Sequence, residues 1–214
     1  MAEAEVRNPL FARLYTWLSG GAEKAGAGEH RDENLAGLRG RVVEIGAGNG
    51  LNFAHYPAEV EEVVAVEPEP YLRARAREAA ATAPVKVTVV DGTADRLPGA
   101  DGEFDAAVAS LVLCTVPDPA GALAEARRVL RPGGELRFYE HVRADDPGLA
   151  RWQDRLARRL WPAVGGGCHP NRDTEAAIAA AGFEVERARR FDFRPGPGMV
   201  IVEPHVIGVA RRAS

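Results

Sequence analysis

The chain has 214 residues, of which 46% are hydrophobic, and its 27 Lys and Arg residues and 31 Asp and Glu residues give a formal net charge of -4. This length suits one domain with a single core and a ligand pocket, so we expect one domain over residues 1–214. The acidic balance argues against a nucleic acid partner, and two cysteines are too few for a disulfide framework. We expect a small-molecule partner and a cytoplasmic location.

The first forty residues predict helices ahead of the main body of the domain. Apolar residues at helical spacing predict a helix from Pro9 to about Ser19, and a Gly/Ala-rich stretch over residues 20–30 is typical of a linker. A short polar helix is expected near residues 31–38. Charged residues interrupt the apolar run well before membrane-spanning length: Glu3, Glu5, Arg7 and Arg13. We therefore expect a helical lid over residues 1–40 and no integral membrane segment.

The next hundred residues alternate strand-like and helix-like patterns. The strand-like runs are residues 41–45, 62–67, 85–90, 103–110 and 135–142. Helices are expected from about Leu51, over residues 69–83, and over residues 118–130 with Asp118 as the N-cap. Aliphatic strands that lack a polar face and alternate with helices indicate a parallel sheet covered on both sides. We predict a doubly wound, Rossmann-like α/β fold whose cofactor-binding core is residues 41–142.

The last part of the chain, residues 143–214, has a different pattern. A helix over residues 174–181 ends at Gly182, and two strand-like runs follow, over residues 183–193 and 205–212. Because no helix separates these runs, they should pair antiparallel. We expect this part to supply acceptor-side helices and C-terminal strands.

A glycine-rich turn follows the first predicted strand, within GRVVEIGAGNGLNFAHYP at residues 40–57. Gly46, Gly48 and Gly50 permit positive φ and a close approach of the backbone to a ligand. A dinucleotide fingerprint would need a further glycine where Leu51 stands, and Glu44 would repel a pyrophosphate but suit a cationic amine. These features disfavour an NAD-dependent oxidoreductase.

A second acidic residue, Glu67, ends the second predicted strand about 20 residues after the first glycine, where a carboxylate accepts hydrogen bonds from ribose hydroxyls. A ribose together with a cationic amino acid describes S-adenosylmethionine. Two functions fit such a site: an S-adenosylmethionine-dependent methyltransferase, or a regulatory protein that binds the cofactor without turnover. The intact glycine loop bears on the cofactor site and says nothing about an acceptor site.

Several blocks resemble the class I S-adenosylmethionine-dependent methyltransferases, of the methyltransferase domain 11 type. In chain order over residues 42–142 they are VVEIGAGNG, VAVEPEP, VVDGTADRLP, EFDAAVASLVLCTVPDP and RVLRPGGELRFYEHV. Other stretches are similar to small methyltransferases related to the mammalian methyltransferase-like 7 thiol methyltransferases: NFAHYP, LVLCTV, LRPGG, EHV, GGCHPNRDT and PHVIGVA. The resemblance implies a seven-stranded sheet with an antiparallel last strand. It also implies methyl transfer to a small apolar molecule, such as a thiol, with S-adenosylhomocysteine as the product.

The resemblance further implies a set of cofactor-binding residues. The loop after the first strand would hold the methionine moiety, the end of the second strand the ribose, the motif after the third strand the adenine, and the end of the fourth strand the sulfonium. In that order the residues are Glu44, Gly46, Ala47, Gly48, Gly50 and Asn52; Glu67, with Pro68 near the adenine; Asp91, Gly92, Thr93 and Ala94; and Ser110, Leu111 and Val112. The resemblance implies mammalian relatives with a hydrophobic N-terminal anchor, and we expect no such anchor in this sequence.

The acceptor site is expected at the carboxyl edge of the sheet. A sulfonium is an activated methyl donor, so the protein must align an acceptor lone pair and exclude water. A thiolate needs little more than desolvation, whereas a hydroxyl requires a general base. His141 is the candidate base, and it joins Tyr15, Trp161 and His205 as a candidate acceptor-binding residue. Sulfur, oxygen, nitrogen and carbon stay open as the accepting atom.

No metal is predicted. Cys168 and three histidines, His141, His169 and His205, have no compact ligand spacing, and methyl transfer from a sulfonium needs no metal. Cys114 lies in an aliphatic run and is expected to be a small core residue.

Overall fold

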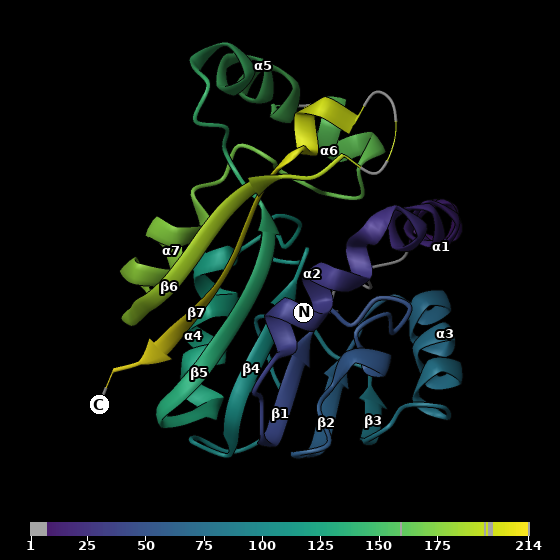
Figure 1. Cartoon of the computed structure of the whole chain (residues 1–214), viewed down its shortest axis with the longest axis vertical. Coiled ribbons are helices and arrows are strands. Elements are labelled where there is room, and N and C mark those ends of the chain that lie inside the picture. Colours follow the sequence, from purple (N-terminus) through teal and green to yellow (C-terminus); the bar gives the residue numbers. More distant parts are fainter. Residues whose placement is uncertain (1–7, 159, 195, 197–198, 214) are drawn as a thin grey trace, which may run out of the picture.

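The computed structural model describes residues 8–158, 160–194, 196 and 199–213, so the charged residues Glu3, Glu5 and Arg7 lie outside the described part. Within the described residues one seven-stranded sheet has the order β3-β2-β1-β4-β5-β7-β6 (Figure 1). The strands are β1 (Gly40–Ile45), β2 (Val60–Val66), β3 (Lys86–Val90), β4 (Phe104–Ser110), β5 (Leu130–His141), β6 (Phe183–Asp192) and β7 (Pro204–Arg212).

Strands β1 to β5 are parallel to one another, because β1 pairs with β2 and β4, β2 pairs with β3, and β4 pairs with β5. The last strand, β7, runs antiparallel to both β5 and β6. The predicted sheet with its antiparallel last strand is therefore confirmed. The carboxyl ends of the five parallel strands meet at one edge, which is where open α/β sheets bind ligands.

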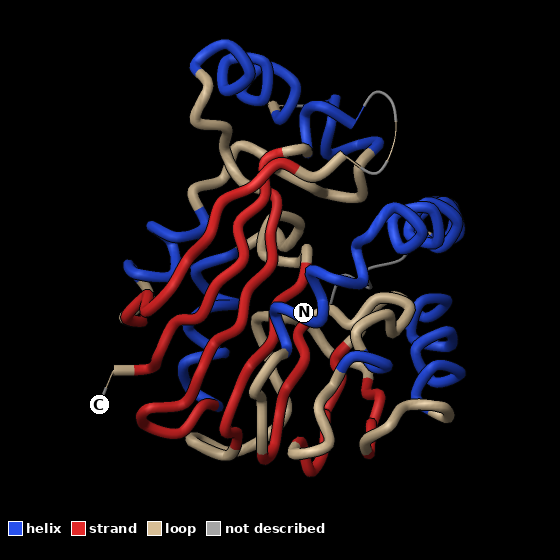
Figure 2. The backbone as a smooth tube through the Cα atoms, viewed as in Figure 1, coloured by secondary structure: helices blue, strands red, loops and turns tan. Residues whose placement is uncertain are grey.

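Helices cover both faces of the sheet (Figure 2), and each face has its own hydrophobic core. These helices are α2 (Gly28–Leu35), α3 (Pro70–Ala80), α4 (Pro119–Val129) and α7 (Thr174–Ala180). In β1, Val43 and Ile45 belong to the core of α4 and α7, whereas Val42 belongs to the core of α2 and α3. The alternation follows from the two-residue period of a strand. Asp118 caps α4 as predicted, because its carboxylate accepts from the Gly121 amide at 3.0 Å.

Two local predictions were wrong. The expected linker at residues 20–30 is helical: α1 (Pro9–Ala22) continues through a π-helical turn, Glu23–Ala27, into α2. A positive φ of 104° at Gly26 bends this path, and burial of Ala27 against the domain holds the chain in place where helix propensity alone would not.

The helix expected from about Leu51 is absent from the described structure. Only a 3-10 turn, Phe53–His55, forms between β1 and β2. Asn52 uses its side chain to bond a buried carboxylate, and Tyr56 is extended, as is usual before a proline such as Pro57. The segment between the glycine loop and that proline is therefore too short for a regular helix.

Two further helices, α5 (Pro147–Ala157) and α6 (Leu160–Val164), lie above the carboxyl end of β5, with α1 on the neighbouring side (Figure 1). A 3-10 turn at Met199–Val202 packs with α5 and leads into β7. In the described part of the chain, no helix has the length and apolar character needed to cross a membrane.

Candidate active site

The glycine loop turns sharply at the end of β1. Gly46 and Gly48 have φ values of 65° and 58°, in the left-handed region that a residue with a side chain rarely adopts. At Gly46 an added Cβ would also overlap the Val112 side chain, which comes from the loop after β4. Glycine is thus required here both for backbone conformation and for contact between the two loops.

Glu67 lies at the end of β2 and is 5% exposed. Its carboxylate accepts hydrogen bonds from the Gly48 amide at 2.8 Å and the Glu69 amide at 2.9 Å, and burial raises its pKa. An acidic side chain therefore stands directly against the glycine loop, as predicted from its place in the sequence.

The motif after β3 is tied to the same edge by Arg73. Its guanidinium donates to the carbonyls of Glu67 and Pro68 and, at 2.9 Å, to the carboxylate of Asp91. Gly92 lies against Val66, because an added Cβ would come within 3.0 Å of its side chain. Thr93 and Ala94 follow in this motif, Thr93 bridging to Arg96 and Ala94 packing on the core. The residues assigned to the adenine side are thus brought beside Glu67.

Glu44 lies beneath the loop in a buried polar network. Its carboxylate accepts from Asn52 at 2.9 Å and from the Tyr56 hydroxyl at 2.8 Å, and burial raises its pKa to about 7. Arg31 donates to the Asn52 amide oxygen at 2.7 Å and pairs with Glu23 at 2.9 Å. The sequence singled out Glu44 and Asn52, whereas their link to α2 through Arg31 is visible only in the structure.

The end of β4 joins this network through Ser110. Its hydroxyl accepts from the side-chain amides of Asn52 at 3.1 Å and Asn34 at 3.3 Å. Leu111 then has a φ of 58°, the one positive value at a non-glycine residue among those described. Such strain is concentrated at functional sites, and here it occurs where the chain leaves β4.

Helix α1 lies across the glycine loop. The Tyr15 hydroxyl would be 3.5 Å from a Cβ added at Gly48, and Asn49 of the loop donates to Ser19 at 3.2 Å. At the other side, Phe11 packs against Gly166, where an added Cβ would overlap its ring. One helix therefore contacts both the glycine loop and the GGGC segment, residues 165–168, and it places Tyr15 at the edge where ligands bind.

Glu140, near the end of β5, is fully buried and holds the loop after β4. Its carboxylate accepts from the amides of Val112 at 3.0 Å, Leu113 at 2.8 Å and Cys114 at 3.1 Å, while burial raises its pKa. Both oxygens are occupied, so Glu140 positions the loop.

His141 stands between two sulfur atoms. Its Nδ1 lies 3.6 Å from Cys114 Sγ and 3.5 Å from Cys168 Sγ. The interaction between the two thiols lowers the pKa of Cys168 and raises that of Cys114, and Trp161 packs against the same cysteines. Cys114 is buried, as predicted, but its neighbours were missed because the three residues are 27 positions apart along the chain.

His205 lies opposite His141 on β7, with ring centroids 4.6 Å apart. Its Nδ1 donates to the Glu203 carbonyl at 2.8 Å, and burial lowers its pKa to about 3, so the ring is neutral near pH 7. A cluster of rings that the sequence reasoning did not single out surrounds it: His30, Tyr139, Phe191 and Phe193. The aromatic pairs in FYEH and FDF were the available signal.

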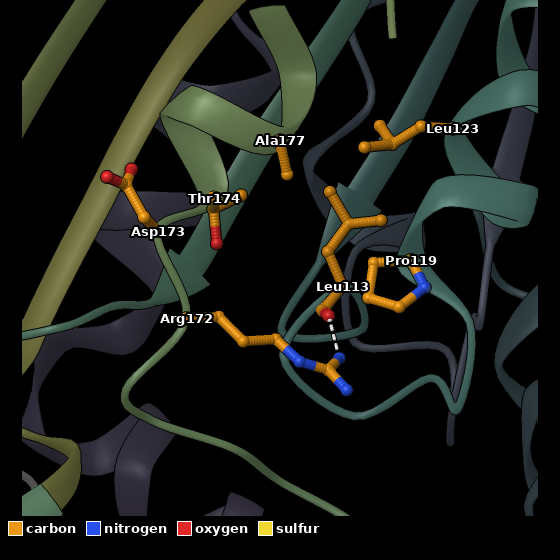
Figure 3. Close-up of a pocket in the computed structure, with 7 residues that line it drawn as sticks. All are labelled: Leu113, Pro119, Leu123, Arg172, Asp173, Thr174 and Ala177. Carbon is orange, nitrogen blue, oxygen red and sulfur yellow. Dashed lines mark hydrogen bonds between the residues drawn. The ribbon is translucent and has the colours of Figure 1, made fainter. Parts of the chain in front are cut away.

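Two cavities lie near this edge. One of about 160 Å³ is bounded by the loop after β4 and by α4 and α7, and Figure 3 shows the Arg172 guanidinium directed at the Leu113 carbonyl. The other, of about 240 Å³, borders Phe191 and His205. No residue of the glycine loop lines either cavity.

Comparisons with known proteins agree with this geometry. Residues 43–138 match the family described as "Methyltransferase domain". The chain is 34% identical over 184 residues to thiol S-methyltransferase TMT1B of Homo sapiens, covering 83% of this chain and 74% of that protein. It is 33% identical over 155 residues to the ubiquinone/menaquinone biosynthesis C-methyltransferase UbiE of Dinoroseobacter shibae, covering 71% and 60%.

Among solved structures, an S-adenosylmethionine-dependent methyltransferase from Thermotoga maritima, described as a possible histamine N-methyltransferase, superposes with a TM-score of 0.69 at 25% identity. The match covers 94% of this chain and 96% of that one.

Proposed function

The chain belongs to the S-adenosylmethionine-dependent methyltransferase family, and from this premise we propose that it methylates the sulfur of a small, apolar thiol. The observation that carries the proposal is the carboxyl edge itself, where a glycine loop with its acidic partner follows β1 and a histidine with two sulfur atoms beside it ends β5. The similarity to thiol S-methyltransferases supports the same acceptor class.

The residues at the glycine loop fit the cofactor. The left-handed glycines carry no Cβ that would separate the loop backbone from a ligand, and Glu67 offers a buried acceptor for ribose hydroxyls. We assign the methionine end to the loop over Glu44 and Asn52, and the adenine to Pro68 and the motif that begins at Asp91. When bound there, S-adenosylmethionine supplies a methyl group on a good leaving group.

The acceptor side favours a soft nucleophile. A hydroxyl acceptor needs a general base, but Glu140 is committed to three backbone amides. His141 faces sulfur atoms through Nδ1. We assign acceptor contacts to Tyr15, His141, Trp161 and His205. The contacts of α1 with the glycine loop and the GGGC segment support the lid role proposed for it.

Aromatic side chains border this edge. Phe191 and His205 line the cavity of about 240 Å³, and their ring centroids lie 5.6 Å apart. Binding sites for apolar small molecules are lined by such groups, so we expect the acceptor to carry a hydrophobic body. The neutral ring of His205, among aromatic side chains, is compatible with the same kind of ligand.

A paired panel tests the acceptor. The chain is incubated with isotopically labelled S-adenosylmethionine and with thiols matched to alcohols of the same skeleton, such as thiophenol with phenol, and also with amines and quinones. Mass spectrometry should find S-methyl products and S-adenosylhomocysteine with the thiols and not with the matched alcohols. Methylation at oxygen, nitrogen or carbon overturns the acceptor assignment. Tight cofactor binding without any product would favour the regulatory alternative.

A further inference from the structure

Three side chains with metal-binding atoms converge at the carboxyl edge, outside the residues assigned to the cofactor. Cys114 Sγ, His141 Nδ1 and Cys168 Sγ all lie within 4.8 Å of one another. The two cysteines are buried, with exposures of 1% and 6%, whereas His141 is half-buried. Two thiols and one imidazole form a donor set that suits Zn²⁺, which binds thiolate sulfur and imidazole nitrogen.

The two sulfur–nitrogen distances match those of a tetrahedral zinc site. With Zn–S near 2.3 Å and Zn–N near 2.05 Å, a tetrahedral angle places sulfur and nitrogen about 3.6 Å apart. The His141 Nδ1 atom is 3.6 Å from Cys114 Sγ and 3.5 Å from Cys168 Sγ. Each sulfur–nitrogen pair is therefore spaced as two ligands of one zinc ion.

Hydrogen bonds of the main chain hold Cys114 and His141 in place without using their own side chains. The Cys114 amide donates to the Glu140 carboxylate at 3.1 Å and its carbonyl accepts from the His169 amide at 2.7 Å. His141 is fixed by its pairing with His205 in the sheet. This is the preorganisation that a metal site requires, because the ligands must be within a few tenths of an ångström of their positions.

The glycines before Cys168 allow its approach. Gly167 has a φ of 90°, and a Cβ added there would lie 3.1 Å from the Thr115 carbonyl oxygen. The GGGC segment therefore lies directly on the loop that carries Cys114. The Cys168 amide is bonded at 3.1 Å to the Gly165 carbonyl, which closes the turn.

We propose that Cys114, His141 and Cys168 bind a zinc ion whose fourth position takes the acceptor thiol as a thiolate. Three protein ligands with one open position are the arrangement of catalytic zinc sites, whereas structural sites have four. The site departs from the sequence-based expectation of no metal. Its assignment to the acceptor rests on the proposed thiol methylation, while zinc binding itself does not.

The chemistry balances without a further reactant. On coordination the acceptor thiol releases its proton to solvent, because zinc lowers the pKa of a coordinated thiol. A lone pair of the zinc-bound sulfur then forms the new S–CH3 bond, and the bond between the methyl carbon and the sulfonium breaks with its electron pair going to the cofactor sulfur. The products are a neutral thioether, S-adenosylhomocysteine and one proton. A neutral thioether is a weaker ligand than a thiolate and leaves the metal.

Metal content and cobalt spectra test the site without reliance on activity. The full chain is reduced, exposed to ZnCl2, desalted and analysed for bound zinc, and Co²⁺ is then used in place of zinc. We expect one metal per chain and the thiolate-to-cobalt absorption of a two-cysteine tetrahedral site. Cys114→Ser, Cys168→Ser and His141→Ala should each weaken zinc binding by more than the roughly 10- to 100-fold that loss of an outer-shell partner causes.

His169→Gln is the matched control. His169 follows Cys168 directly, but its ring is bonded to the Gly167 carbonyl at 2.7 Å, so zinc content should stay at the wild-type value. Circular dichroism shows whether each variant folds, and the cobalt spectrum of the wild-type chain does not depend on any variant. A reduced wild-type chain that binds no zinc and gives no thiolate–cobalt band overturns the site, as does a Cys114–Cys168 disulfide as its resting state.

Removal of zinc tests the role of the metal in thiol methylation separately from zinc binding. If chelation removes zinc and thiol methylation falls at least tenfold, then returns on adding Zn²⁺, the acceptor role stands. Unchanged thiol methylation by the zinc-free chain refutes this role but leaves the proposed function intact. Zinc binding without methylation of any thiol in the panel refutes the acceptor assignment and leaves only a metal site.

Discussion

Replacement of Glu67 by alanine tests the ribose assignment most directly. The carboxylate is 5% exposed and accepts hydrogen bonds from the amides of Gly48 at 2.8 Å and Glu69 at 2.9 Å. A hydrogen bond to a charged group contributes about 1.5–3 kcal/mol. Since water can enter the space left by the side chain, we expect the free energy of unfolding to fall by about 2–4 kcal/mol, less than or similar to the sum of both bonds.

Cofactor affinity should fall separately from stability. Glu67→Ala removes the acceptor for the ribose hydroxyls, so S-adenosylmethionine binding should weaken by about 1–3 kcal/mol, which is about 5- to 150-fold in Kd. Isothermal titration calorimetry measures the affinity, and urea denaturation measures the stability of the same preparation. The calorimetric and denaturation measurements are both made at a temperature at which the Glu67→Ala variant is folded.

Glu69→Ala provides the control, because Glu69 is also a buried carboxylate, at 7% exposure, only two positions away. Its side chain caps α3 by accepting from the Leu72 amide at 2.8 Å. Loss of such a cap costs about 0.5–2 kcal/mol of stability and should leave cofactor affinity unchanged. Unchanged affinity in Glu67→Ala, or an equal loss in both variants, would refute the ribose assignment.

Substitutions at three further positions, one of them with a compensating change at Val112, probe the rest of the edge. His141→Ala should lower turnover far more than cofactor affinity, as steady-state kinetics and calorimetry would show, and an intact rate would make His141 a structural residue. Between pH 4.5 and 7 the folded chain keeps the Glu44 proton that the unfolded chain has lost, so stability contributed by Glu44 falls as pH rises, by up to about 3 kcal/mol. Urea denaturation at pH 5 and pH 8 should therefore show Glu44→Gln gaining stability relative to wild type at the higher pH, and a constant difference would contradict the raised pKa. Gly46→Ala should destabilise the chain by about 1–3 kcal/mol, since its Cβ overlaps Val112 and its φ is 65°; Val112→Ala in the same chain should relieve the overlap only, and full recovery would show that the positive φ carries no cost.

Local sequence determined most of the sheet and the cofactor edge. The aliphatic run of β1 and the glycines after it predict a buried strand followed by a tight turn, because side-chain period and positive φ are properties of a few adjacent residues. Glu67 could be placed for the same reason, since the end of β2 must lie beside the end of β1 once the strands are parallel neighbours. The antiparallel pairing of β6 and β7 followed from the absence of a helix between them.

Only the tertiary structure decided which distant side chains meet. The helical path through residues 20–30 depends on packing of Ala27 against the domain and on the Arg31–Glu23 pair, neither of which local propensity encodes. Cys114 and Cys168 stand on loops separated by more than fifty residues, and they meet at His141 because the carboxyl ends of parallel strands share one edge. The spacing of Cys114, His141 and Cys168 along the chain does not encode this convergence. The sequence therefore predicted the cofactor residues, whereas the meeting of the two sulfur atoms was visible only in the structure.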